Sequence, residues 1–319
     1  MFSTVLFSTL LFTSIHCLVA FKSLFSKLLF TSIHCLVAFK SAPNVTFGLP
    51  SHYFEISKNV IPPFANDFNC KSSLPPVVLV HGTMDNQNVN WLTLSPLLAR
   101  EGRCPYVFNY GGYPDFIMSL LPAPNAMGMG GISSSAMELA TFVDQVLSKT
   151  NSKQVDLVGF SQGGMLPHLF IRDLGGMEKV RNFVALSPSN HGTNLQVMEE
   201  LRKANPEQAA KEDIINLDVM NAICISCIQQ LDDSAFMSKL HSKPLPVPRV
   251  NYTIISTRND LTVVPYTSQF LLNYQNVKNY LLQDGCPGRI ASHADMPFDE
   301  RALGILMNAL NDKSDPIVC

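Results

Sequence analysis

The sequence predicts an α/β fold in which a mostly parallel sheet carries helices on both faces. Short, continuously apolar runs alternate with segments of helical spacing, and such runs are typical of strands buried on both faces. One run, Val155–Phe160, leads directly into the pattern Gly-x-Ser-x-Gly at residues 159–163. A strand, this turn and a following helix form the context in which the pattern carries chemistry.

Each apolar run that is bounded by turn residues is a predicted strand. The first, Val77–His81, follows Pro76 and ends in the turn His81-Gly82-Thr83. The later predicted strands span residues 106–110, 155–160, 180–186, 250–256 and 277–282.

The segments between the strands are predicted to be helical. The strongest is Ser133–Lys149, where Ser135 and Glu138 predict a capping box at the start of the helix. Residues 195–240 are mostly helical in composition, and we interpret them as a helical insertion that forms a cap. The other predicted helices span residues 90–100, 165–174 and 300–310.

The charge and composition exclude several classes of function. The chain has 23 basic and 25 acidic side chains and a formal net charge of −2, so nothing indicates nucleic-acid binding. The sequence has no metal pattern such as His-Glu-x-x-His, and we predict neither a metal nor a cofactor.

The N-terminus contains a perfect repeat. Residues 10–23 read LLFTSIHCLVAFKS, and residues 28–41 repeat them identically. Each copy has a short apolar run like the h-region of a secretory signal. The first run, Val5–Phe21, is marginal for a membrane span, which needs about 20 residues. We interpret residues 1–42 as a signal-like leader, with a retained membrane anchor as the alternative, and residues 43–319 as one domain.

The cysteines and sequons fit a secreted domain without a stable transmembrane anchor. Outside the leader, the cysteines permit three disulfides in several pairings. They are Cys70, Cys104, Cys224, Cys227, Cys286 and Cys319. A redox or metal role for Cys224-x-x-Cys227 is disfavoured, because the chain has no second such pair. Asn44 and Asn251 begin sequons that could carry glycans, although Asn251 opens a predicted strand.

Ser161 is the candidate nucleophile. A serine on a strained strand-to-helix turn presents its hydroxyl where a base can reach it. Gly159 and Gly163 flank it because side chains there would collide with the neighbouring strand and helix. A serine hydroxyl is a poor nucleophile at neutral pH, so it needs a base, and the base needs an acid to orient it.

The chain order of such sites is Ser, then Asp or Glu, then His. Asp260, in the loop after the predicted strand 250–256, is the best acid, ahead of Asp284, Asp295 and the acids of the insertion. His293, in the loop before the last helix, is the best base. His191 and His241 precede Asp260, so the chain order excludes both. His168 is expected on the helix behind the nucleophile, where it packs or faces solvent.

A tetrahedral intermediate also needs preorganised N–H donors. The backbone of Gln162, the residue after the nucleophile, is expected to supply one donor. The turn at His81-Gly82-Thr83 is expected to supply the other from the backbone of Thr83, with the Thr83 hydroxyl as a possible third.

Several motifs, taken in order, are more specific than any one of them. They are PPVVLVHGT (75–83), GFSQGG (159–164), SNHGT (189–193), the Cys-x-x-Cys stretch followed by Ser234–Leu240, NDLTVVP (259–265) and SHAD (292–295). Over roughly residues 68–319 the chain resembles the class 2 lipases of the α/β-hydrolase fold.

The resemblance implies the same site as the residue pattern: Ser161, Asp260 and His293 as the catalytic residues, with Thr83 and Gln162 at the oxyanion hole. It also implies the disulfides Cys70–Cys104, Cys224–Cys227 and Cys286–Cys319. The implied reaction is hydrolysis of a carboxylic ester through an acyl-enzyme, with an ester lipid as the substrate, at a lipid–water interface. The alternatives are a palmitoyl-type thioesterase and a catalytically inactive lipid-binding hydrolase scaffold.

Overall fold

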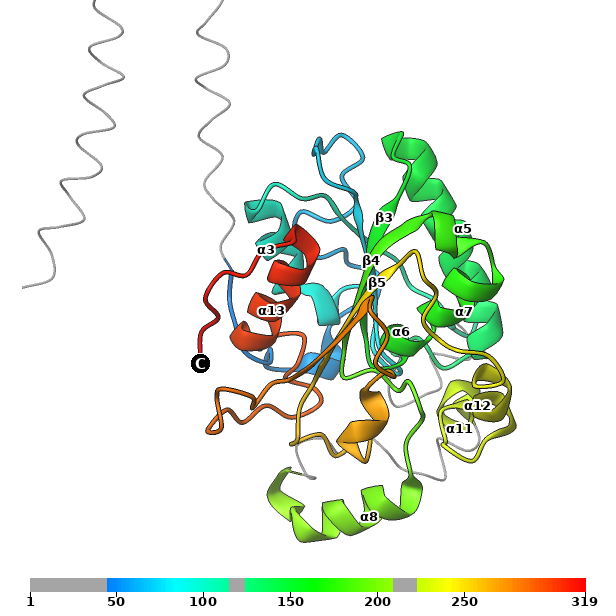
Figure 1. The fold of residues 1–319 in the computed structure, drawn as a ribbon, viewed down its shortest axis with the longest axis vertical. Coiled ribbons are helices and arrows are strands. Elements are labelled where there is room, and N and C mark those ends of the chain that lie inside the picture. The colour runs from blue at the N-terminus through cyan, green and yellow to red at the C-terminus, as the bar shows by residue number, and fades with distance from the viewer. Residues whose placement is uncertain (1–44, 115–123, 209–222) are drawn as a thin grey trace, which may run out of the picture. The chain divides into compact units, whose positions relative to one another are not determined.

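A six-stranded parallel sheet forms the centre of the fold (Figure 1). The computed structural model describes residues 45–114, 124–208 and 223–319, so the leader and part of the expected cap lie outside the described residues. Pro43–Cys319 form one compact unit. Within the ranges described, no helix has the length and apolarity that a membrane span requires.

The strand order β2-β1-β3-β4-β5-β6 places β1, the first strand along the chain, inside the sheet and not at its edge. The strands are β1 (Val77–Val80), β2 (Pro105–Val107), β3 (Val155–Phe160), β4 (Val180–Leu186), β5 (Asn251–Ser256) and β6 (Val277–Leu281). From β1 the chain moves to the edge at β2, returns to β3 on the other side of β1, and then adds each strand in one direction. Because all strands are parallel, the loops that follow β1, β3 and β5 leave the same end of the sheet.

Helices cover both faces of the sheet (Figure 1). Val78 and Val80 pack into the cluster with α5 and α7, whereas Val77 and Leu79 pack into the cluster with α3 and α13. The described helices are η2 (Tyr53–Glu55), η3 (Val89–Trp91), α3 (Leu94–Arg100), α5 (Ile132–Thr150), α6 (Gln162–Met165), α7 (Pro167–Asp173), η4 (Gly176–Glu178), α8 (Leu195–Ala204), α11 (Ile225–Gln229), α12 (Ala235–Leu240), η5 (Tyr266–Gln269) and α13 (Glu300–Asn311). Burial on both faces explains why the strands read as continuous apolar runs.

Two local expectations were wrong. Strand β2 ends at Val107 and not at residue 110, because the Asn66 side chain pairs with both backbone groups of Val107. Gly131, with no side-chain cap, precedes α5, so Ser135 and Glu138 form no capping box. The Ser135 hydroxyl instead donates to the Gly131 carbonyl, and the Glu138 carboxylate accepts from the N–H of Gly111.

A buried ion cluster ties the end of α13 to the sheet. Asp156 on β3 accepts hydrogen bonds from Arg103 and Arg181. Both arginines also donate to the carbonyl of Leu310, each at 2.8 Å. The side chains of Arg103 and Asp156 are fully buried, so Asp156 compensates the charge of Arg103, and the two arginines together compensate that of Asp156.

We predict that Arg103→Met lowers the free energy of unfolding by about 3–5 kcal/mol, because the buried carboxylate of Asp156 loses one of its two arginine partners. The matched control is Arg249→Met, which removes an ion pair with Glu178 whose side chains are 65% and 62% exposed. Urea unfolding followed by circular dichroism measures both variants. Equal losses in the two variants would contradict the assigned role of burial.

Candidate active site

Ser161 lies on a strained turn between β3 and α6. Its backbone angles, φ 55° and ψ −121°, fall in a region that non-glycine residues rarely adopt. The turn is possible because residues 159 and 163 are glycines. A Cβ on Gly159 would lie 1.9 Å from the Gly163 carbonyl oxygen, and a Cβ on Gly163 would lie 2.1 Å from the Val80 carbonyl oxygen. Only glycines fit where the helix returns this closely to the sheet.

Ser161, His293 and Asp260 form one line of hydrogen bonds. His293 Nε2 lies 3.0 Å from Ser161 Oγ, and His293 Nδ1 lies 2.6 Å from Asp260 Oδ2. The three residues come from the loops after β3, β5 and β6, and they are 6%, 2% and 7% exposed for Ser161, Asp260 and His293. An imidazole held in this way can take the proton of a serine hydroxyl, and a carboxylate can stabilise the imidazolium that results.

Every acceptor position of Asp260 is engaged. Oδ1 accepts the backbone N–H groups of Thr262 and Val263 at 2.8 and 2.7 Å. Oδ2 accepts from Gln269, on η5, at 2.8 Å in addition to His293. Four donors therefore fix the orientation of the carboxylate that faces the imidazole.

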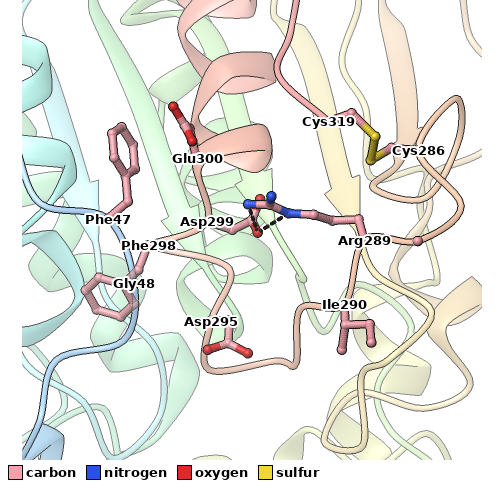
Figure 2. A pocket seen from close by; sticks show the side chains of 11 residues that line it. Phe47, Gly48, Cys286, Arg289, Ile290, Asp295, Phe298, Asp299, Glu300 and Cys319 are labelled. Atoms are coloured by element: carbon pink, nitrogen blue, oxygen red, sulfur yellow. Dashed lines mark hydrogen bonds and ion pairs between the residues drawn. A yellow bond between two sulfur atoms is a disulfide. The ribbon is translucent and has the colours of Figure 1, made fainter. Parts of the chain in front are cut away.

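The loop that carries His293 is fastened at both ends. Arg289 forms an ion pair with Asp299, the residue that caps α13, with 2.8 Å between Arg289 Nε and Asp299 Oδ2 (Figure 2). The disulfide Cys286–Cys319 holds the start of the loop to the C-terminus. These residues line a pocket of about 650 Å³, and neither Ser161 nor His293 is among its lining residues. Figure 2 shows the side chains that line this pocket, among them Phe47, Ile290 and Phe298.

The side chains of Thr83 and Gln162, the two residues expected to supply oxyanion donors, contact each other. Thr83 Oγ1 donates to Gln162 Oε1 at 2.9 Å, so the structure gives the hydroxyl a partner other than a substrate. Within the described part of the chain, no hydrogen bond satisfies the backbone N–H of Thr83 or of Gln162. Two unpaired backbone donors beside a serine hydroxyl can stabilise a developing oxyanion.

Gln230 completes this polar cluster, and the sequence analysis missed it. Its Nε2 donates to Thr83 Oγ1 at 2.8 Å and to Gln162 Oε1 at 3.0 Å, and its Oε1 accepts from Ser189 at 2.7 Å. Gln230 follows α11, inside the segment interpreted as a cap. The sequence marks Gln230 only by its position shortly after the Cys-x-x-Cys pair. A lone glutamine does not reveal a partner in a distant loop.

The excluded histidines lie elsewhere. His191 and His241 stack with ring centroids 4.5 Å apart, and each pairs with a backbone carbonyl. His168 is buried on α7, where it pairs with Asn190 and stacks on Tyr252. These contacts give all three histidines structural partners.

The residues that the structure describes contain three disulfides, and they are the pairs that the family resemblance implies: Cys70–Cys104, Cys224–Cys227 and Cys286–Cys319. The second closes the turn that leads into α11, and it packs with Ala126 and Met129. Across the described ranges, no three His, Cys, Asp or Glu side chains are grouped to hold a metal ion.

Burial shifts the pKa of two groups in the strand-end loop after β1. Desolvation lowers the pKa of His81 to about 4, so its imidazole is neutral at physiological pH. Desolvation also raises the pKa of Asp85 to about 6, against hydrogen bonds from Tyr53 and Asn90 and the charge of His293, which lower it.

Comparison with solved structures establishes the fold. Aspergillus fumigatus lipase B matches with a TM-score of 0.60 and 18% identity, over 79% of this chain and 55% of that chain. Mature Bacillus licheniformis lipase BlEst2 matches with a TM-score of 0.52 and 13% identity, over 75% of this chain and 93% of that chain. At these identities the likenesses establish the fold, which is that of the α/β hydrolases.

The family of class 2 lipases matches residues 75–276. The chain therefore belongs to the class 2 lipase family. The predicted fold class and family are confirmed.

The buried histidines predict an acid-labile fold. Burial lowers the pKa of His168 from 6.5 to about 3, so its neutral form contributes stability above pH 6.5 that is lost as the pH falls toward 3. His81 acts in the same direction, and the raised pKa of Asp85 partly offsets both, because its contribution is lost as the pH rises through about 6.

We predict that wild type loses more stability than His168→Gln between pH 7 and pH 4.5, by on the order of 2 kcal/mol. Glutamine can still donate to Asn190, but it does not titrate. Urea unfolding at the two pH values measures the difference. The same loss in both proteins would show that folding does not lower the pKa of His168.

Proposed function

We propose that the protein is a secreted carboxylic-ester hydrolase, a triacylglycerol lipase that acts through an acyl-enzyme on Ser161. The observation that carries the proposal is the line of hydrogen bonds from Asp260 through His293 to Ser161 Oγ. Membership of the class 2 lipase family supports the ester bond as the target.

In the proposed mechanism, His293 Nε2 takes the proton of Ser161 as Oγ attacks the carbonyl carbon of the ester. Asp260 holds Nδ1 as a donor and stabilises the imidazolium, while its own proton count does not change. The imidazolium then protonates the leaving alcohol. A water molecule, activated by the same imidazole, releases the fatty acid and restores Ser161.

The unpaired N–H groups of Thr83 and Gln162 are proposed to bind the oxyanion of both tetrahedral intermediates. Their loops are joined by the hydrogen bonds from Thr83 Oγ1 and from Gln230 to Gln162 Oε1, at 2.9 and 3.0 Å. Donors that are held before the substrate arrives need no reorganisation during the reaction, which is where their catalytic effect originates.

The proposed secreted setting rests on the leader pattern and on the disulfides. We propose residues 1–42 as a leader and residues 43–319 as the catalytic domain. N-terminal sequencing of the exported protein should find a start after Ala20, Ala38 or Ala42. Of the two sequons, Asn44 is the better glycan site, because the Asn251 side chain donates to Asn182 at 3.0 Å at the start of β5.

We predict that Ser161→Ala lowers kcat for ester hydrolysis by at least about 10⁴-fold, because no other group can form the acyl-enzyme. The matched control is Ser256→Ala, which removes a buried serine hydroxyl at the end of β5 and is expected to keep more than half of the activity. Steady-state kinetics on a p-nitrophenyl ester measures both. Full activity in Ser161→Ala would refute the proposed nucleophile.

We predict that kcat/KM is higher for long-chain acylglycerols and long-chain p-nitrophenyl esters than for acetyl esters, because a lipase binds an apolar acyl chain. Parallel assays on acyl-thioesters separate the proposed activity from that of a palmitoyl-type thioesterase. A sharp preference for short, soluble esters would replace lipase by esterase, and a preference for thioesters would replace both.

A further inference from the structure

The loop that carries Thr83 is bound by residues 53–58, which we call the N-terminal segment. This segment precedes the family-matched residues 75–276. Three consecutive amide side chains of the loop donate to backbone carbonyls of this segment. They are Asn86 to Ile56 at 3.0 Å, Gln87 to Lys58 at 3.0 Å and Asn88 to Ser57 at 3.2 Å. The N-terminal segment therefore follows the loop along its length.

Tyr53, on η2 in this segment, reaches further in. Its hydroxyl donates to Asp85 Oδ1 at 2.5 Å and accepts from Asn90 Nδ2 at 2.5 Å. Asn90 Oδ1 in turn accepts the backbone N–H of Gly82 at 2.9 Å. One chain of hydrogen bonds thus joins the Tyr53 hydroxyl to the residue before Thr83.

The consequence for Thr83 follows from its neighbours. Asn90 holds the N–H of Gly82, and the Met127 carbonyl holds the N–H of Met84 at 2.8 Å. The unpaired N–H of Thr83 lies between these two pinned amides, so its direction depends on both. A Cβ on Gly82 would lie 2.6 Å from Asp85 Oδ2, which shows how tightly the carboxylate packs beneath the turn.

Burial makes these contacts costly to lose. Tyr53, Asp85 and Asn90 are 7%, 6% and 0% exposed. The Tyr53 ring also packs edge-on against Phe298, with centroids 6.0 Å apart, which holds the hydroxyl in place. A buried carboxylate that loses its donor has little solvent to replace it, so the loop would have to shift to compensate.

We propose that Tyr53 is a positioning residue for the oxyanion site, which acts through Asp85 and Asn90 to fix the direction of the Thr83 N–H. The proposal rests on the ester-hydrolase function proposed above. It makes the N-terminal segment part of the catalytic apparatus, although it contributes no atom to the reaction.

The test compares Tyr53→Phe with Tyr106→Phe in the full-length protein. Both tyrosines are buried, and the hydroxyl of Tyr106 donates to the Asp67 carbonyl at 3.2 Å in the same N-terminal region, away from the Thr83 loop. Tyr53→Phe should lower kcat by about tenfold with KM within about twofold, since loss of a whole oxyanion donor costs about 10²–10³. Tyr106→Phe should leave kcat within about twofold.

Two further measurements separate positioning from stability. The inhibition constant of a boronic acid, whose serine adduct is tetrahedral, should rise in Tyr53→Phe by about the factor that kcat loses. Asn90→Ala, which removes the acceptor of the Gly82 N–H at the other end of the same chain, should lower kcat with KM within about twofold, and so provides a readout if Tyr53→Phe does not fold.

The opposing outcomes are distinct. A lower melting temperature with unchanged kcat, a change in KM alone, equal losses in the two tyrosine variants, or an unchanged kcat in Asn90→Ala would each overturn the proposal. A wild-type protein without ester hydrolysis, or full activity in Ser161→Ala, would overturn the proposed function instead.

Discussion

The close approach of Gly163 to β1 is the constraint on which the rest of the site depends. A Cβ at this position would lie 2.1 Å from the carbonyl oxygen of Val80 and 2.4 Å from that of His81. Because α6 can begin directly against the end of β1, the Gln162 side chain reaches Thr83 and accepts a hydrogen bond from its hydroxyl. The same approach forces Ser161 into its strained conformation, with φ 55°. One steric fact therefore places both the candidate nucleophile and the candidate oxyanion donors.

Around this contact, buried polar side chains form hydrogen bonds that hold the loops of the site together. Gln230 joins the Thr83 loop to α11 from one side, and Asn90 holds Gly82 from the other. Four donors surround Asp260, including Gln269. Hydrogen bonds in such buried networks strengthen one another, so the geometry of the site depends on several of these contacts together.

The sequence predicted the parts that local rules determine. Apolar runs placed the strands, and the order of Ser161, Asp260 and His293 along the chain named residues that the structure brings within hydrogen-bond distance. Gln230 and Tyr53 escaped prediction because each meets its partners through folding, far from them in sequence, and neither residue type implies a distant contact. The wrongly predicted capping box at Ser135 is the converse case. The local pattern predicted a cap, but the Ser135 hydroxyl donates instead to the Gly131 carbonyl one turn earlier.

The central claim is that Ser161 attacks an ester carbonyl and carries the acyl group. Labelling of the folded protein with a fluorophosphonate, followed by peptide mass spectrometry, tests it most directly. The account predicts one phosphonyl group, on Ser161, and slower labelling when His293 is replaced by glutamine. A folded wild-type protein that stays unlabelled, or a label that falls on another serine, would contradict it.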